Sequence, residues 1–366
     1  MGTGVVAKSA VPGTARRRTA PTWSFSAGFD LAVGLCWVPV FLVAHVLDGL
    51  PGATGATFLR DGVVVALLVS FAHQPLTFGL VYGDAGQFRL HRRLFVLAPL
   101  VAVAAAAAGA FANLSVVIPI AALWNLQHTL QQRYGIQRIY AGRAGYGSAR
   151  LDRAFAYVPM VAALAAVAAS RATAGLVARS GLDPMNAGAA HLLVSIRPAA
   201  TALALTAAAA SLAVVVAVLR QEAAAGERAN PAKWLYQLSF LALLGGLVVD
   251  PAAGFIAYVS AHAIEYAVVV DRTAKRRYGS AGAGGEDGRV SFLGKAARSA
   301  AGRVAFFAAI AALAVAVHET LGGPVLNTVV YSVGALHFTF DAVIWKLRKP
   351  ALKKDFRIPL AGAVAR

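Results

Sequence analysis

Four histidines lie inside long apolar stretches of this 366-residue chain, where an ionisable side chain is costly unless it is paired, bound to a metal or facing water. They are His73, His128, His262 and His337. The other four histidines lie in loops or near the ends of apolar stretches, where they can reach the membrane interface. Imidazole is the commonest metal ligand among protein side chains. The four internal histidines are therefore candidate ligands of a metal ion.

Two carboxylates accompany these histidines at helical spacing. Glu265 follows His262 by three residues, and Asp341 follows His337 by four. Each carboxylate therefore lies on the same helix face as its histidine. We predict Glu265 and Asp341 as catalytic residues that either bind the metal directly or orient their own histidines through hydrogen bonds.

The residues around His128, in the sequence WNLQHTLQQRYGIQRIY, add further candidates. Trp124, His128 and Gln131 share one helix face, and Arg133 and Tyr134 follow directly. We predict Gln131 and Tyr134 as further catalytic residues. We predict Trp124 as a cofactor-binding residue, because it can line a pocket beside His128. Arg133 is either an interface residue or a cofactor-binding residue that holds a lipid phosphate or another anionic head group.

The composition predicts that the bilayer is the solvent of this chain. The sequence is 58% hydrophobic and only 14% charged, which a soluble domain of this size does not tolerate on its surface. Ten apolar runs are each long enough, at about 20 residues, to cross a hydrocarbon core. The predicted fold is therefore an all-α, polytopic transmembrane bundle. Its spans are 29–49, 62–83, 94–112, 114–136, 154–170, 197–219, 233–250, 252–271, 302–321 and 324–345.

The distribution of basic residues predicts the direction of each span. With the N-terminus in the cytoplasm, 30 of the 34 Lys and Arg residues fall on the cytoplasmic side. The remaining four are Arg60, Arg171, Arg179 and Arg197. Positively charged loops are retained in the cytoplasm, so we expect both termini to be cytoplasmic in a multi-pass protein of the cell inner (plasma) membrane.

No soluble domain is expected. Residues 1–28 form a basic cytoplasmic segment, 29–345 the transmembrane bundle and 346–366 a basic cytoplasmic tail, and the Gly-rich stretch within 272–301 reads as a flexible cytoplasmic loop. Cys36 is the only cysteine, which excludes an intramolecular disulfide and a thiolate metal cluster. The net charge of +18 comes from basic residues between the spans, which are explained by membrane topology, so we expect no nucleic-acid partner.

The predicted topology brings the four histidines to one depth. Their spans, the second, fourth, eighth and tenth, all run from the outer to the cytoplasmic side. The histidines lie roughly 11 to 14 residues into these helices, at a rise of about 1.5 Å per residue. We therefore expect the four imidazoles near one plane, slightly toward the cytoplasm.

Four imidazoles with one or two carboxylates suit iron, and less well copper, zinc or manganese. Ferrous iron with open coordination positions binds dioxygen, while the protein supplies ligand geometry and a dry pocket. The sequence thus predicts a non-haem iron oxidoreductase or oxygenase. Its expected partners are the lipid bilayer, an apolar substrate that arrives laterally from it, and an electron donor.

The placement of His73, His128, His262 and His337 in separate spans resembles that of the polytopic membrane non-haem iron oxygenases. These include the histidine-ligated bacterial carotene dioxygenases and, more remotely, the desaturase and hydroxylase class. The resemblance covers the four histidines alone, because the adjacent-histidine motifs of desaturases, such as H-x-x-H-H, do not occur in this chain. It implies a substrate of the lipid or isoprenoid type.

Two alternatives remain open from the sequence. Histidines from facing helices can be axial ligands of haem in an electron-transfer or quinone-linked protein, although no span carries the two histidines, two to four turns apart, that are typical of four-helix cytochromes. The histidines and carboxylates can also form the relay of a proton-coupled transporter. Pro75 and Pro119 predict breaks in the second and fourth spans, but the eighth and tenth have no counterpart.

Overall fold

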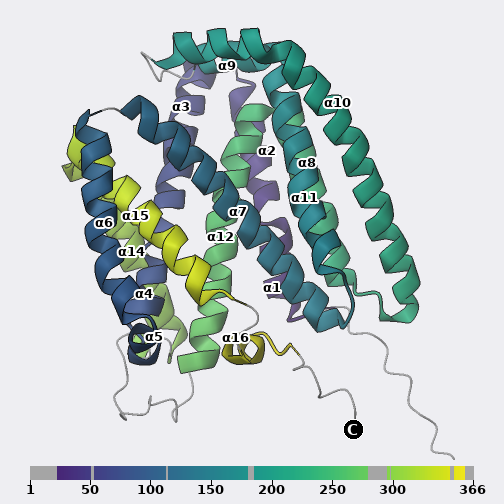
Figure 1. Ribbon diagram of the computed structural model, residues 1–366, viewed down its shortest axis with the longest axis vertical. Helices are drawn as coiled ribbons and strands as arrows, with labels where there is room; N and C mark the ends of the chain where they lie inside the picture. The colour runs from purple at the N-terminus through teal and green to yellow at the C-terminus, as the bar shows by residue number, and fades with distance from the viewer. Residues whose placement is uncertain are drawn as a thin grey trace, which may run out of the picture.

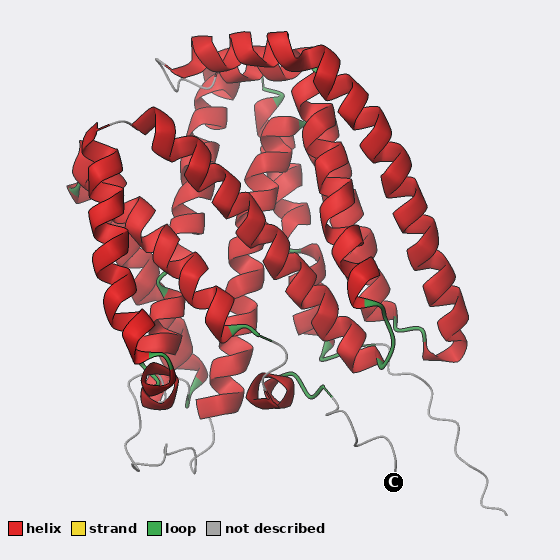
Figure 2. Ribbon diagram, in the orientation of Figure 1, coloured by secondary structure: helices red, strands yellow, loops and turns green. Residues whose placement is uncertain are grey.

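The computed structural model describes residues 23–50, 53–112, 114–179, 185–278, 295–296, 298–346 and 350–358. Within these ranges the regular structure is helical throughout, and no strand is present (Figure 2). Most of the predicted segment 1–28, most of the loop 272–301 and most of the tail 346–366 lie outside the described residues.

The helices follow one another with short connections. The N-terminal half contains α1 (Ala27–Leu35), α2 (Trp37–Asp48), α3 (Ala53–His73), α4 (Leu76–Tyr82), α5 (Ala85–Leu90), α6 (Arg92–Ala112), α7 (Leu114–Ala144), α8 (Ala149–Ala169) and α9 (Arg171–Arg179). The C-terminal half contains α10 (Met185–Ala225), the 3₁₀ turn η1 (Gly226–Arg228), α11 (Pro231–Val249), α12 (Pro251–Tyr278), α14 (Ala300–Thr320), α15 (Gly323–Ile344) and α16 (Pro350–Asp355).

Eight helical segments of the described chain are long and apolar enough to cross a membrane. All ten predicted spans coincide with helices, but α7 and α15 are not among the eight. Both helices carry a histidine together with other polar side chains, which lower their mean hydropathy. The two least apolar of the predicted spans are therefore also two of the four that bring histidines to the centre of the bundle.

Helix α12 is the centre of the bundle, with α1, α2, α3 and α11 packed against it (Figure 1). Of its most apolar window, 78% is buried, against 11% for the window in α10 and 6% for α14. The outer helices instead expose large apolar side chains such as Leu100, Leu205 and Val304. A surface of this kind is stable in lipid, because the apolar atoms meet hydrocarbon there rather than water.

The four histidine-bearing helices α3, α7, α12 and α15 all run in the same direction, from the upper to the lower end of the view in Figure 1. Basic side chains gather at the lower end. This end holds α5 with Arg89, the last turn of α12 with Lys275, Arg276 and Arg277, and α16 with Lys353 and Lys354. We call it the basic end of the bundle.

Only one of the two predicted proline breaks occurs. At Pro75, which has no backbone N–H, α3 ends at His73 and α4 begins at Leu76. Here the amides of Gln74 and Thr77 bond three residues back, to Phe71 and Gln74. The predicted break at Pro119 is wrong, because Pro119 lies inside the continuous helix α7.

Candidate metal centre

The proline break positions the first histidine. His73 is the last residue of α3, and Thr77 lies in the first turn of α4, so both side chains enter the bundle from one interrupted span. The other three histidines lie within continuous helices: His128 in α7, His262 in α12 and His337 in α15. Four helices thus contribute one imidazole each.

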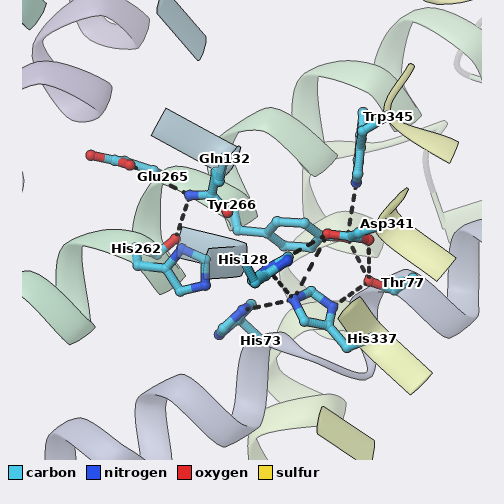
Figure 3. Close-up of polar contacts among 10 residues, drawn as sticks. All are labelled: His73, Thr77, His128, Gln132, His262, Glu265, Tyr266, His337, Asp341 and Trp345. Carbon is cyan, nitrogen blue, oxygen red and sulfur yellow. Dashed lines mark hydrogen bonds and ion pairs between the residues drawn. The ribbon is translucent and has the colours of Figure 1, made fainter. Parts of the chain in front are cut away.

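The four imidazoles converge in the interior of the bundle (Figure 3). One ring nitrogen from each lies within 4.8 Å of the other three. The Nε2 atom of His337 is 3.2 Å from Nε2 of His73 and 3.0 Å from Nε2 of His128. The ring of His262 stands edge-on to His73, with 4.7 Å between the ring centroids, and to His128, at 5.2 Å. Nitrogens bound at 2.0–2.1 Å to a common ion lie about 3 to 4 Å apart, so the observed group needs only small closing movements to hold one.

The histidines are removed from solvent and lipid, and several of their nitrogens have no partner. Their exposed fractions are 5% for His73, 8% for His128, 1% for His262 and 0% for His337. Both ring nitrogens of His262 and Nδ1 of His73 lack a hydrogen-bond partner. A buried polar atom without a partner is costly, and a metal ion bound by the histidines would satisfy nitrogens of this kind. The group therefore has the donors and the burial of a metal site.

A second layer of side chains fixes the orientation of His337. Its Nδ1 lies 2.6 Å from Thr77 Oγ1, and the Thr77 hydroxyl donates to Asp341 Oδ1 at 2.9 Å. Because the single hydroxyl proton of Thr77 is used on Asp341, the bond to His337 requires Nδ1–H as donor. In neutral imidazole this leaves the lone pair on Nε2, which faces His73 and His128. Metal-binding histidines are held in the same way in proteins.

Asp341 is held by two further aromatic side chains. The Tyr266 hydroxyl donates to Asp341 Oδ1 at 2.8 Å, and the indole Nε1 of Trp345 donates to the Tyr266 hydroxyl at 3.2 Å. The other carboxylate oxygen, Oδ2, lies 3.8 Å from Nε2 of His337 and 4.0 Å from Nε2 of His128. Asp341 therefore presents one oxygen to the hydrogen-bond network and one to the histidine group.

Glu265, the other predicted carboxylate, is bound differently. Its Oε1 accepts from Arg133 Nη1 at 2.9 Å, and its Oε2 accepts from Gln132 Nε2 at 3.4 Å. Gln132 also donates to the backbone oxygen of His262 at 3.0 Å. Glu265 and Arg133 are 1% and 3% exposed and form a buried ion pair. The carboxylate thus binds across to α7 rather than lying among the imidazole nitrogens, and Arg133 lies inside the bundle rather than at its surface.

Three predicted residues lie on the outer side of α7. Trp124 is 43% exposed and packs on Phe338, with 5.6 Å between the ring centroids. Gln131 is exposed and donates to the Tyr157 hydroxyl at 2.8 Å. Tyr134 lies beneath the Arg153 guanidinium, at 5.2 Å. None of the three contacts the ring nitrogens of the histidines.

Tyr266 and Phe338 are neighbours of the site that the sequence reasoning missed. Tyr266 lies four residues after His262, the spacing that marks a shared helix face. Phe338 directly follows His337, and its ring stacks on His128 from another helix, at 4.6 Å. The first could have been found from its spacing, whereas the second depends on how α7 and α15 meet.

Comparisons with protein-family models, with curated proteins and with solved structures find no match to this chain. The site is therefore interpreted from its own geometry. It consists of four buried imidazoles able to hold a metal ion, inside a helical bundle suited to a membrane.

Proposed function

We propose that this chain is a membrane-embedded, metal-dependent oxidoreductase that uses non-haem iron to oxygenate an apolar substrate of the lipid or isoprenoid type. One observation carries the proposal: four buried imidazoles from four helices present ring nitrogens within 4.8 Å of one another. A structural role in packing alone would not require four nitrogen donors at one point with several of them unpartnered.

The proposed ligands are His73, His128, His262 and His337. Asp341 Oδ2, close to two of them, supplies either a fifth donor or the negative charge that compensates the metal. Nitrogen donors with a carboxylate are typical of iron sites in proteins. When bound there, ferrous iron would supply dioxygen binding and one-electron chemistry, so an electron donor is a further proposed partner.

The convergence of the imidazoles favours non-haem iron over haem. A porphyrin provides four equatorial nitrogens and leaves two axial positions for protein ligands. Four histidine nitrogens within 4.8 Å of one another use the positions that a porphyrin would occupy. The haem alternative therefore accounts for only two of the four histidines.

The route to the site supports a substrate from the lipid phase. Phe338 stacks on His128 and is covered in turn by Trp124, which is 43% exposed on the outer face of α7. Two aromatic side chains therefore separate the histidine group from the surrounding lipid. Displacement of these rings would admit an apolar molecule laterally without opening a path for water, which protects reactive intermediates.

We further propose ten spans with both termini in the cytoplasm of the inner (plasma) membrane. The proposal adds α7 and α15 to the eight apolar segments and takes the basic end of the bundle as the cytoplasmic end. The basic segments 1–28 and 346–366 then flank a single transmembrane domain, 29–345.

Metal analysis and an absorption spectrum of the purified protein test the site. We expect iron without a sharp Soret band, and loss of the iron in His128→Ala and His262→Ala with expression and membrane insertion intact. His318→Ala is the matched control, because His318 is exposed in α14. Full metal retention in both site variants would contradict the proposed metal centre, and a Soret band would establish haem.

Activity is tested separately with β-carotene and total lipid as probes. Iron-loaded protein in nanodiscs containing either probe is supplied with ¹⁸O₂, with and without ascorbate as electron donor, and products are analysed for ¹⁸O by mass spectrometry. Incorporation that is absent from His262→Ala supports an oxygenase. Iron binding without incorporation into either probe would exclude both as substrates.

The interrupted span at His73 favours a proton-coupled transporter as the second candidate. Broken helices beside ionisable side chains are common at the binding sites of transporters. Proton-driven accumulation of a solute in proteoliposomes, with no product formed, would favour this alternative.

A further inference from the structure

A groove of about 400 Å³ opens between α7 and α8, away from the histidine group. It is lined by Tyr134 from α7 and by Ala149, Arg150, Arg153, Ala154 and Tyr157 from α8. Arg150, Arg153 and Tyr157 lie at positions i, i+3 and i+7, so one face of α8 presents both guanidinium groups and the phenol. The α8 residues of the groove lie in the first turns of that helix, which begins at the lower end of the view in Figure 1, and Tyr134 lies ten residues before the end of α7.

The groove carries positive charge without a compensating carboxylate. Neither Arg150 nor Arg153 has an ion-pair partner in the described part of the chain. Asp152, between them in sequence, is buried and paired with Arg138 of α7. Both arginines also lie in the first turns of α8, where the helix dipole disfavours cations. An anion in the groove would relieve both effects, and the arginine guanidinium matches the geometry of phosphate with two parallel hydrogen bonds.

A polar stripe leads from the groove along the outer face of α7. Trp124, Gln127, Gln131 and Tyr134 follow one another at spacings of three and four, and the first three are exposed. Tyr134 lies about 9 Å along the helix axis from His128, and Trp124 about 15 Å from Tyr134. Exposed amides at this depth are costly against pure hydrocarbon, so their presence favours a polar or amphipathic neighbour.

We propose that the α7–α8 groove binds the phosphate head group of an anionic amphiphile, whose chain lies along the stripe toward Trp124. Arg150 and Arg153 bind the phosphate, and Tyr157, Gln131 and Gln127 contact the glycerol or linker region. The binding itself does not depend on the metal site. Only the further step, that such a molecule is anchored here so that its chain reaches the layer of Trp124 and Phe338, rests on the proposed function.

Native mass spectrometry of the delipidated full-length protein tests the binding. The probes are phosphatidylglycerol and phosphatidylcholine with identical acyl chains, with inorganic phosphate as competitor. We expect the wild-type protein to prefer phosphatidylglycerol. The double variant Arg150→Gln/Arg153→Gln should bind it about 30-fold more weakly, as expected for two basic contacts near a membrane surface.

The matched control is Arg92→Gln/Arg93→Gln, which removes the same charge from two exposed arginines at the start of α6. Equal loss in both double variants would overturn the site, because attraction would then depend on total charge alone. Unchanged binding in Arg150→Gln/Arg153→Gln would also overturn it. Displacement of the lipid by an equal concentration of inorganic phosphate would overturn the proposal that the ligand is an amphiphile, since the acyl chain would then contribute nothing to binding.

The metal content of each variant separates this proposal from the proposed function. Arg150→Gln/Arg153→Gln should retain wild-type metal and an unchanged melting temperature, which also shows that the variant is folded. Selective phosphatidylglycerol binding by a purified protein that contains no metal would support the lipid-binding groove and contradict the proposed metal-dependent function.

Discussion

Nδ1 of His337 and Oγ1 of Thr77 are 2.6 Å apart, although the two residues lie in different spans and 260 positions apart in sequence. The bond directs the Nε2 lone pair of His337 toward His73 and His128, because Thr77 uses its own proton on Asp341. It is the contact through which the interrupted span α3–α4 determines the orientation of an imidazole on α15. The site thus depends on a residue that cannot itself bind the metal.

Replacing Thr77 with Val tests this relationship. Valine keeps the shape of the side chain but cannot accept from Nδ1–H, so His337 can turn or change tautomer. We expect metal affinity to fall by about 10- to 100-fold, as for other partners of metal-binding histidines, when measured by competition with a chelator of known affinity. Thr77→Ser, which keeps the hydroxyl, should stay within a few-fold of wild type. Equal affinities for Thr77→Val and Thr77→Ser would contradict the role of the bond.

The charge of Asp341 is tested by comparing Asp341→Asn with Tyr266→Phe. Tyr266→Phe removes the hydroxyl that donates to Asp341 and accepts from Trp345. Asp341→Asn keeps an acceptor oxygen but removes the carboxylate charge that lies 3.8 Å from His337 Nε2. We expect the larger loss of affinity for a divalent ion in Asp341→Asn, because the charge of the bound ion would be less compensated. Isothermal titration with Fe²⁺ or Co²⁺ under anaerobic conditions measures both. An equal or larger loss in Tyr266→Phe would contradict a dominant role of the charge.

The sequence predicted the histidine group through direction and depth, which follow from hydrophobic length and from the positions of basic residues. It could not predict that α3, α7, α12 and α15 are neighbours, because adjacency depends on the packing of whole helix surfaces. The two carboxylates illustrate the limit. Asp341 and Glu265 each follow a histidine by about one helical turn, at i+4 and i+3, yet Asp341 lies beside the histidine group while Glu265 binds Arg133 of another helix.

The bond between Arg133 and Glu265 predicts a pattern of stability. Arg133 is enclosed by the rings of Phe240, at 5.1 Å, and Tyr258, at 5.0 Å, and its only carboxylate partner in the described structure is Glu265. Removing one charge of a buried pair leaves the other uncompensated, which costs about 3–5 kcal/mol. We expect this loss for Arg133→Met in unfolding by SDS in mixed micelles.

The double variant Arg133→Met/Glu265→Met is the control for this pair. It should be more stable than Arg133→Met alone, because no charge is then left buried without a partner. Additive losses from the two single changes would show that the groups contribute independently and would contradict a coupled pair.

Phe338→Ala tests the route from the lipid. Removing this ring takes away the side chain that separates Trp124 from His128, so a membrane-permeant chelator such as 2,2′-bipyridyl should extract the metal several-fold faster. Phe340→Ala is the control, since Phe340 is equally aromatic and lies on α15 but packs against Phe95 of α6, at 5.0 Å. Extraction that is faster in both variants would indicate general loosening of α15 rather than a route through Phe338.

Close packing at the turn between α11 and α12 affects both the stability of the protein and the position of His262. A Cβ atom added at Gly254 would lie 2.3 Å from the Cα of Leu247, where backbone cannot give way, whereas one added at Gly245 meets nothing within 4 Å. Gly254→Ala should therefore displace the start of α12 and destabilise the protein by about 1–3 kcal/mol. Because His262 lies eight residues further along the same helix, we also expect weaker metal binding.

Gly245→Ala should affect neither property, and both are measured on the same samples by SDS unfolding and chelator competition. Unaltered metal affinity in a clearly destabilised Gly254→Ala protein would show that the histidine group is held by α3, α7 and α15 independently of how α12 begins.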